Sequence, residues 1–338
     1  MTIENRILAF QKLGKFLGSY NSKNFQQEHP LKQAILKSKI TNPWFTEDNV
    51  YNALFSISNQ LSQHNLEQWL KSYSLNIEIK KRVAIIMAGN IPLVGFHDFL
   101  CVLISGHKAI IKLSSKDNHL LPALVNELIN IAPVLNDDIM FVDRLENNFD
   151  AVIATGSNSS YKHFQNYFKN YPSLLRHSKT SVALLKGNES LEERQALAKD
   201  IFLYYGLGCR NVTKLYLPEN YDLDLLFEVF YPFKDIILNH KYANNYDYYK
   251  AIYLMGKQAI IENGFLIMKK DTALHSPVAV LNYEFYSNIE ILKNDLKKMS
   301  NDLQCIVGQG YTPFGHAQNP KLNDYADGLD TLAFLKAI

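Results

Sequence analysis

The sequence is organised around one stretch in which apolar runs alternate with a helical pattern. Val83 to Met87 is a short apolar run rich in β-branched residues, which is typical of a strand buried on both faces. The segment from Leu93 to Ile104 is apolar nearly all round, so we expect a buried helix with Pro92 in its first turn. Ala109 to Leu113 follows as a second strand. Two strands joined by one helix predict a right-handed βαβ unit in a parallel sheet.

The same alternation of strands and helices continues through most of the chain. Further helices are predicted over 120–131, 159–170, 191–205, 222–238 and 287–302, and further strands over 139–142, 151–154, 181–185, 213–217 and 304–307. Before the central unit, the pattern predicts amphipathic helices, two of them near 31–38 and 46–70, with Thr46 as a cap. The sequence therefore predicts an α/β fold with a doubly wound, Rossmann-type nucleotide-binding domain.

These elements suggest four parts. We expect a helical N-terminal cover over 1–78 and a nucleotide-binding domain over 79–180. A second α/β domain, which carries the catalytic cysteine discussed below, is expected over 181–315, followed by a tail over 316–338.

Composition narrows the functional classes. Hydrophobic residues make up 47% and charged residues 20%, as in an ordinary globular protein, and the net charge of +2 argues against a nucleic-acid partner. The N-terminus lacks a signal-peptide pattern and no apolar stretch is long enough to span a membrane, so we expect a cytoplasmic protein. Three scattered cysteines suggest neither a disulfide framework nor a metal site.

The three cysteines differ in their surroundings. Cys101 lies in the apolar helix and Cys305 in a predicted buried strand, so we expect both to be core residues. Cys209 follows two glycines at a helix-to-strand turn and precedes Arg210, whose guanidinium would favour the thiolate. Local sequence alone leaves open whether Cys209 is a nucleophile or an ordinary turn residue.

Four motifs together resemble the aldehyde dehydrogenase superfamily. They are Gly89-Asn90-Ile91-Pro92-Leu93, the Gly106 turn into Ile110-Ile111-Lys112-Leu113-Ser114, Thr155-Gly156-Ser157, and Gly206-Leu207-Gly208-Cys209. More narrowly, residues from about 80 to 315 are similar to the acyl-CoA reductase branch, which includes the fatty-aldehyde-producing reductases of bacterial bioluminescence.

This resemblance implies a role for each motif. Cys209 matches the nucleophile that holds the acyl group as a thioester, and Asn90 matches the side-chain donor to the oxyanion, although it could equally be a helix N-cap. Lys112 matches the lysine that contacts the cofactor's ribose. The remaining cofactor-binding positions implied by the resemblance are Met87, Ala88, Gly89, Ser114, Ser115, Thr155, Gly156, Ser157 and Ser160.

Two departures from the superfamily pattern change the expected chemistry. The water-activating glutamate of classical members would fall in Leu174–Thr180, which contains no carboxylate. Losing a general base slows its step by about two to four orders of magnitude, which favours transfer to or from a thiol such as coenzyme A over hydrolysis. A second glutamate, which holds the nicotinamide ribose, would fall near Ala273. His275 could replace it or could be a plain loop residue.

The resemblance also guides the choice of cofactor. NAD-preferring members have an acid shortly after the strand-end lysine, whereas Ser114, Ser115 and Lys116 follow Lys112 here. Serines and a lysine would accept a 2′-phosphate, so we favour NADPH, with NADH still possible.

The resulting hypothesis is an NADPH-dependent reductase that converts an acyl-CoA to the aldehyde through a thioester on Cys209. An acyl-phosphate reductase of the same superfamily and a non-catalytic nucleotide-binding protein remain alternatives. The superfamily also implies a homo-oligomer joined by a β-arm, for which 242–253 or the strands within 258–282 are candidates.

Overall fold

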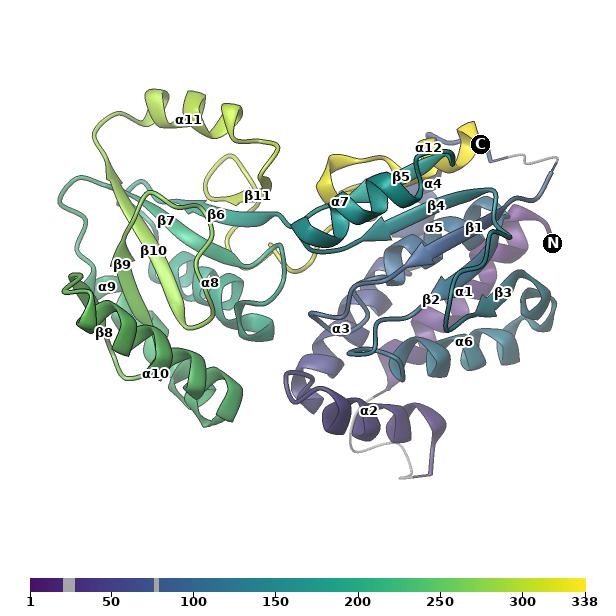
Figure 1. The fold of residues 1–338 in the computed structure, drawn as a ribbon, viewed down its shortest axis with the longest axis horizontal. Helices are drawn as coiled ribbons and strands as arrows, with labels where there is room; N and C mark the ends of the chain where they lie inside the picture. The colour runs from purple at the N-terminus through teal and green to yellow at the C-terminus, as the bar shows by residue number, and fades with distance from the viewer. Residues whose placement is uncertain (21–27, 76–78) are drawn as a thin grey trace. The chain divides into compact units, whose positions relative to one another are not determined.

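The computed structural model describes residues 1–20, 28–75 and 79–338, which form two compact units (Figure 1). Unit 1 comprises Met1–Ser178 and Lys321–Ile338, and unit 2 comprises Lys179–Pro320. The chain thus leaves unit 1 after Ser178 and returns to it at Lys321. Each unit has its own β-sheet and hydrophobic core, so each is described by itself.

The sheet of unit 1 is parallel throughout. Its strands are β1 (Arg82–Ile86), β2 (Lys108–Lys112), β3 (Ile139–Phe141), β4 (Ala151–Thr155) and β5 (Ser173–Arg176). They are ordered β3-β2-β1-β4-β5, which is the doubly wound order of a nucleotide-binding domain. The predicted βαβ unit and its parallel pairing are therefore confirmed, while β5 is a strand that the hydrophobic pattern did not reveal.

Helices cover both faces of this sheet. They are α1 (Ile3–Ser19), α2 (Pro30–Thr41), α3 (Glu47–Gln60), α4 (Gln63–Leu70), α5 (Phe96–Ser105), α6 (Leu120–Ile131), α7 (Asn158–Tyr167) and α12 (Thr331–Ala337), with 3-10 turns η1 (Pro133–Asp138) and η4 (Ala326–Gly328). On one face, α1 to α6 and α12 share a single core with the sheet. Phe164 of α7 packs on the other face, which buries Phe149 and Phe168.

The N-terminal region contains more helices than the pattern predicted. Thr46 is the N-cap of α3, as predicted, because its side chain accepts the N–H of Asn49. The predicted helix over 46–70 is wrong as one element, however, because Ser62 caps a second helix, α4, in the same way.

The central helix begins later than predicted. Helix α5 starts at Phe96, and Pro92 lies in the turn before it, so the prediction of a helix over 93–104 is wrong at its start. Leu93 has a left-handed backbone (φ 58°), which breaks the helical path at that residue. The N-cap position of α5 is Gly95, so the alternative role of Asn90 as the cap of this helix is excluded.

The sheet of unit 2 has six strands. They are β6 (Thr180–Leu184), β7 (Val212–Pro218), β8 (Ile260–Glu262), β9 (Ile267–Lys270), β10 (Val280–Tyr286) and β11 (Leu303–Val307). Their order is β11-β6-β7-β10-β9-β8, and all neighbours are parallel except β8 and β9. The second α/β domain expected from the sequence is thus present as a mostly parallel sheet.

The helices of unit 2 are shorter than predicted. They are α8 (Leu191–Phe202), α9 (Asp224–Phe230), α10 (His240–Met255) and α11 (Ile289–Lys298), with 3-10 segments η2 (Leu203–Gly206) and η3 (Tyr231–Leu238). The helix predicted over 191–205 ends at Phe202, because Tyr204 and Tyr205 have left-handed backbones. The helix predicted over 222–238 changes to 3-10 geometry after Phe230, and the one predicted over 287–302 stops at Lys298. The segment 242–253 lies in α10, so it is not a β-arm.

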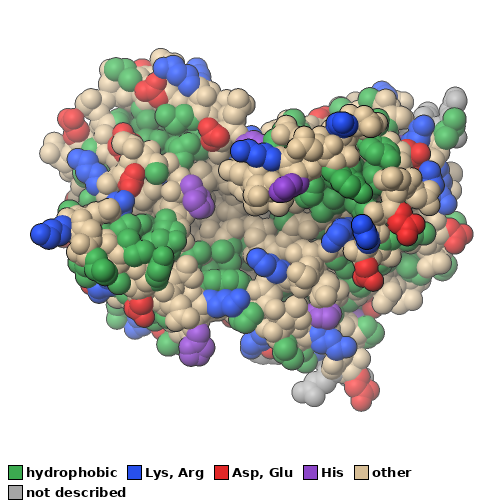
Figure 2. Space-filling model, in the orientation of Figure 1, with side chains coloured by type: hydrophobic (Ala, Val, Ile, Leu, Met, Phe, Trp, Pro, Cys, Tyr) green, Lys and Arg blue, Asp and Glu red, His purple; other side chains and the backbone are tan. Residues whose placement is uncertain are grey.

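Charges of both signs are mixed on the face of the molecule that Figure 2 shows, where Lys and Arg side chains lie among Asp and Glu. Within residues 1–20, 28–75 and 79–338, no helix combines the length and the hydropathy that crossing a membrane requires.

Candidate functional site

The predicted cofactor residues of unit 1 gather at one edge of its sheet. Met87–Asn90 follows β1, Lys112 ends β2, and Thr155–Ser157 ends β4 and leads into α7. Because these three strands are parallel neighbours, their carboxyl ends lie side by side. The carboxyl edge of a doubly wound sheet is where dinucleotides bind, so the residues present fit a nicotinamide dinucleotide.

The turn after β1 packs closely on the turn after β2. A Cβ added to Gly89 would lie 2.6 Å from Ser114 Oγ and 3.2 Å from Lys116 Cβ, so glycine is required there. Ser114 is half-buried and its Oγ accepts the N–H of Lys116, whereas Ser115 and Lys116 are exposed. The exposed pair is therefore better placed than Ser114 to meet a ligand.

A buried carboxylate that sequence reasoning missed holds the turn that carries Asn90. Asp117 is 7% exposed, and its Oδ2 accepts the N–H of Leu93 at 2.8 Å. Asn90 itself is exposed at the start of this turn. The hydrogen bond stabilises the left-handed Leu93 backbone and so fixes the path of the chain between Asn90 and α5.

Asp117 should make stability depend on pH. Burial raises the pKa of its carboxyl to about 6, above the unfolded value of about 3.9. Between pH 4 and 6 the Asp117 carboxyl is therefore protonated in the folded state but ionised in the unfolded state. The protonated carboxyl stabilises the fold, and this stabilisation is lost as the pH rises through 6. Asp117→Asn keeps an acceptor for Leu93 and carries no charge. As the pH rises from 4 to 7, the free energy of unfolding of Asp117→Asn should therefore increase by about 3 kcal/mol relative to that of the wild type.

Urea unfolding of both proteins across that range measures this gain. The change in the difference between the two curves, rather than its absolute value at one pH, is the quantity predicted. A difference that stays constant from pH 4 to pH 7 would contradict the assignment of the proton to Asp117.

The start of α7 presents two hydroxyl groups. Ser157 is the N-cap, and its Oγ accepts the N–H of Ser160 at 3.2 Å and lies 3.0 Å from Ser160 Oγ. A Cβ on Gly156 would come within 2.7 Å of Ser160 Cβ, so the approach to the helix requires glycine. Backbone N–H groups at a helix start favour anions, and the predicted contact with a pyrophosphate fits this arrangement.

The segment that would carry a water-activating glutamate has a structural role instead. Arg176 ends β5 and is 2% exposed, and its Nη1 lies 2.5 Å from Asp98 Oδ2 on α5. Its Nη2 donates to Thr331 Oγ1 of α12 at 2.8 Å. Arg176 is thus a buried cation that ties α5 and the C-terminal segment to the sheet.

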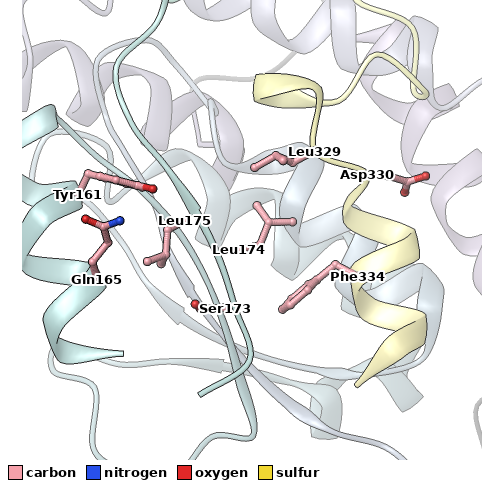
Figure 3. Close-up of a pocket in the computed structure, with 8 residues that line it drawn as sticks. All are labelled: Tyr161, Gln165, Ser173, Leu174, Leu175, Leu329, Asp330 and Phe334. Atoms are coloured by element: carbon pink, nitrogen blue, oxygen red, sulfur yellow. The ribbon is translucent and has the colours of Figure 1, made fainter. Parts of the chain in front are cut away.

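A groove beside this segment holds no obvious reactive group. It has a volume of about 590 Å³ and is lined by Tyr161, Gln165, Ser173, Leu174, Leu175, Leu329, Asp330 and Phe334. Figure 3 shows that α7 forms one side, the C-terminal segment the other, and β5 the floor. Asp330 accepts a hydrogen bond from Tyr73 and caps α12, so its carboxylate is already used structurally.

In unit 2, Cys209 lies on a turn that two buried side chains hold. The Oγ of Ser181 donates to the carbonyl oxygen of Cys209 at 2.9 Å. Asn211 Oδ1 accepts the N–H of Gly208 at 2.8 Å, while its Nδ2 donates to the carbonyls of Asp200 and Leu203 at the end of α8. Ser181 and Asn211 are both fully buried, and Cys209 is half-buried. The turn is therefore fixed from within while the cysteine is partly accessible.

The backbone before Cys209 adopts a conformation that is rare without glycine. Tyr204, Tyr205 and Gly206 follow one another with left-handed φ angles of 54°, 58° and 74°. Each non-glycine residue in this region costs about 1–2 kcal/mol. The bonds of Asn211 to the helix end and to Gly208 help to offset that strain.

The other two cysteines differ from each other in burial. Cys101 is fully buried in α5, as predicted, and burial raises the pKa of its thiol well above the usual range. The prediction of a buried Cys305 is wrong, because it is half-buried on β11, where its Sγ lies 3.1 Å from Ser181 Oγ. Among the described residues, no three His, Cys, Asp or Glu side chains form a metal-binding group.

Each unit thus carries one group of the predicted site residues. In unit 1 they lie at the carboxyl edge of the sheet, with the exposed Asn90, and in unit 2 Cys209 lies on a fixed turn. Sequence reasoning named these candidates, whose roles stay predictions, but missed Asp117, Ser181 and Asn211, which hold their backbone. Only the position of Asn211, two residues after Cys209, offered a signal in the sequence, because asparagine commonly stabilises turns.

Comparison with known proteins identifies the family. The family model described as acyl-CoA reductase (LuxC) matches residues 15–226, which is more than half of the chain. The long-chain acyl-protein thioester reductase 2 of Photobacterium leiognathi is 24% identical over 281 residues, covering 77% of this chain and 56% of that protein. The corresponding reductase of Aliivibrio fischeri is 27% identical over 184 residues, covering 49% of this chain and 38% of that protein. The matched part of the chain therefore spans only 56% and 38% of the lengths of these two curated relatives.

Solved structures show the fold. Aldehyde dehydrogenase 21 of Physcomitrella patens superposes with a TM-score of 0.63 at 14% identity, covering 98% of this chain and 79% of that protein. The aldehyde dehydrogenase KauB of Pseudomonas aeruginosa gives a TM-score of 0.66 at 13% identity, covering 91% and 72%. The resemblance seen in the four sequence motifs is confirmed: the chain belongs to the acyl-CoA reductase (LuxC) family and has the aldehyde dehydrogenase fold.

Proposed function

We propose that this protein reduces an acyl thioester to the aldehyde with a nicotinamide cofactor, through a covalent thioester on Cys209. The observation that carries the proposal is the Cys209 turn. It presents a half-buried thiol at the start of a central strand, and Ser181 and Asn211 fix its backbone. Such a fixed, partly accessible thiol is suited to covalent catalysis.

The first half of the reaction uses residues of this chain. The Cys209 thiolate attacks the carbonyl carbon of the thioester, and the side-chain amide of Asn90 donates to the oxyanion that forms. When the carbonyl re-forms, the substrate's carbon–sulfur bond breaks and the thiol of the donor leaves. The acyl group is then held on Cys209 as a new thioester.

The second half depends on the cofactor. When bound, the reduced nicotinamide supplies the hydride that converts the Cys209 thioester to the aldehyde and releases the thiolate. In our proposal, Lys112, the exposed Ser115 and Lys116, and the start of α7 hold the dinucleotide. Serine and lysine after β2, without an exposed acid in their turn, favour NADPH over NADH.

The lack of a water-activating carboxylate supports release as aldehyde rather than as acid. No residue in 174–180 is a carboxylate, and Arg176 in this segment is bound to Asp98 and Thr331. An acyl group on Cys209 should therefore survive long enough to be reduced.

In our proposal the acyl group is donated by acyl-CoA. The names of the relatives favour a second candidate donor, an acyl group carried on a protein as a thioester. Both curated relatives are named as reductases of long-chain acyl-protein thioesters. A protein-bound thioester and acyl-CoA present the same reacting group, so the two donors differ only in what carries the sulfur. The acyl phosphate alternative differs in the leaving group.

A substrate panel tests the proposal. Acyl-CoA of several chain lengths, an acylated carrier protein and an acyl phosphate would each be mixed with the protein and NADPH or NADH. Oxidation of the cofactor would be followed by absorbance, and aldehyde by mass spectrometry. We expect aldehyde from the acyl-CoA arm, with NADPH preferred. Aldehyde from the acyl phosphate alone, or from none of the donors, would overturn the proposal.

A further inference from the structure

A β-bulge brings Cys305 to the strand that also holds the Cys209 turn. Strand β6 lies between β7 and β11, so its residue Ser181 has a neighbouring strand on each side. On the β11 side, the pairing register shifts between Leu303 and Ile306. Two residues of β11, one of them Cys305, therefore stand opposite Ser181. A bulge of this kind re-aims a side chain, and bulges are frequent next to active sites.

The hydroxyl of Ser181 joins the two cysteines. Its Oγ accepts the backbone N–H of Cys305 at 3.2 Å and donates to the carbonyl oxygen of Cys209 at 2.9 Å. The sulfur of Cys305 lies 3.1 Å from the same Oγ atom. A backbone atom of Cys209 and the sulfur of Cys305 are therefore neighbours of a single buried oxygen, and both cysteines belong to unit 2.

Both members of this pair are partly accessible, unlike the third cysteine. Cys209 and Cys305 are half-buried thiols, whereas Cys101 is fully buried in unit 1. Oxidation of a cysteine follows its exposure and its thiolate character, so a small dissolved oxidant reaches a half-buried sulfur more readily than one in a core. The two cysteines that share a hydroxyl are thus also the two that such an oxidant meets.

A disulfide places limited demands on this pair. It joins residues whose Cα atoms are about 4.4–6.8 Å apart, and each sulfur is one rotatable bond away from its own backbone. Cys209 lies on a turn and Cys305 on a bulge, rather than at paired positions of regular strands. Both side chains can therefore rotate toward each other without breaking the regular ladder of the sheet.

We propose that Cys305 is the resolving partner of Cys209: when a hydroperoxide oxidises Cys209, the two cysteines join as a reversible disulfide that masks the nucleophile. The inference rests on the proposed function, because Cys209 is taken as the reactive thiol. The disulfide stops acylation, since the sulfur that would attack the substrate is then bonded to another sulfur. It also protects Cys209, because a sulfenic acid without a neighbouring thiol goes on to sulfinic and sulfonic acids, which thiols do not reduce.

The oxidation proceeds in two balanced steps. The Cys209 thiolate attacks one oxygen of hydrogen peroxide, the O–O bond breaks, and the other oxygen leaves as hydroxide and is protonated to water. The Cys305 thiolate then attacks the sulfenic sulfur of Cys209 and displaces hydroxide, which is protonated to a second water. The two thiols supply both protons and both electrons, and the peroxide is reduced. An added dithiol reverses the bond by thiol–disulfide exchange and becomes a disulfide itself.

Mass spectrometry tests this inference without a substrate. After excess hydrogen peroxide, the wild type should lose the mass of two hydrogen atoms and yield one crosslinked peptide pair that contains Cys209 and Cys305. Its acylation by acyl-CoA should disappear, and dithiothreitol should return it to the untreated rate. Cys305→Ala should acylate like the wild type before peroxide. After peroxide it should gain oxygen atoms on Cys209, and dithiothreitol should not restore its acylation.

Cys101→Ala is the matched control, because it also removes one sulfur, and it should form the crosslink and recover like the wild type. Three results would overturn the inference: a crosslink that includes Cys101 or joins two copies of the chain, oxygen added to wild-type Cys209 in place of the crosslink, or equal recovery of the wild type and Cys305→Ala. If Cys305→Ala does not fold, Cys305→Ser replaces it with the same expectations. If the wild type fails to acylate before peroxide, the proposed function fails, and the crosslink alone then decides the inference.

Discussion

Cys209→Ala should gain no acyl mass when it is mixed with acyl-CoA, whereas the wild type should gain one acyl group. Aldehyde formation should fall by on the order of 10⁴ or more, because removing a nucleophile eliminates the covalent route. The change deletes one sulfur atom on a turn whose backbone is held by other residues, so the fold should be retained. Intact mass spectrometry and a coupled aldehyde assay on the same samples measure both effects.

Cys305→Ala is the matched control for this experiment. Its sulfur lies 3.1 Å from the same Ser181 hydroxyl that donates to the Cys209 carbonyl, yet Cys305 lies on a strand rather than on the fixed turn. This variant should acylate and reduce like the wild type. Acylation that persists in Cys209→Ala, or that disappears in Cys305→Ala, would show that Cys209 is not the nucleophile. Loss of iodoacetamide labelling in Cys209→Ala would further separate a reactive thiol from a non-catalytic nucleotide-binding protein.

Asp98→Ala should destabilise the protein by about 3–5 kcal/mol, because it leaves the Arg176 guanidinium buried without its counter-charge. Both side chains of the pair are nearly inaccessible, at 2% for Arg176 and 9% for Asp98. The pair joins β5, α5 and, through Thr331, the C-terminal segment. Urea unfolding monitored by circular dichroism should show the lower midpoint.

A double variant distinguishes the lost pair from lost packing. Asp98→Leu combined with Arg176→Met removes both charges and fills much of the volume, so most of the stability should return. As an exposed comparison, Lys298→Met breaks a pair with Asp295 and should change stability by less than about 1 kcal/mol. A double variant as unstable as Asp98→Ala would show that the ion pair is not the cause.

The fold was predictable where hydrophobic periodicity was strong. The apolar run at 83–87 and the pattern at 120–131 correspond closely to β1 and to α6. Prediction failed where local backbone geometry overrides periodicity. Leu93 turns left-handed and delays α5, and Tyr204–Tyr205 do the same at the end of α8, although neither tyrosine nor leucine favours that conformation.

The sequence offered candidates for the reacting groups but not for the residues that hold them. Glycines that flank Cys209, and the motif that contains Asn90, are visible in the sequence because turns need small residues. Residues that hold them come from distant positions, such as Ser181 for Cys209 and Asp117 for Leu93. Lys214 is fully buried on β7, yet in the sequence it looks like any polar residue in a strand, because its partners, the Thr272 carbonyl and Glu284, come from distant positions.

The return of the chain to unit 1 affects the order of folding during synthesis. Residues 321–338 complete the core of unit 1, where Trp69 donates to Tyr325 and His107 contacts the carbonyl of Leu335. All of unit 2 is translated before these residues leave the ribosome. We therefore expect unit 2 to become compact while the first 178 residues still lack α12. The apolar surface that α12 covers would then be exposed on the nascent N-terminal part, where a chaperone could bind it.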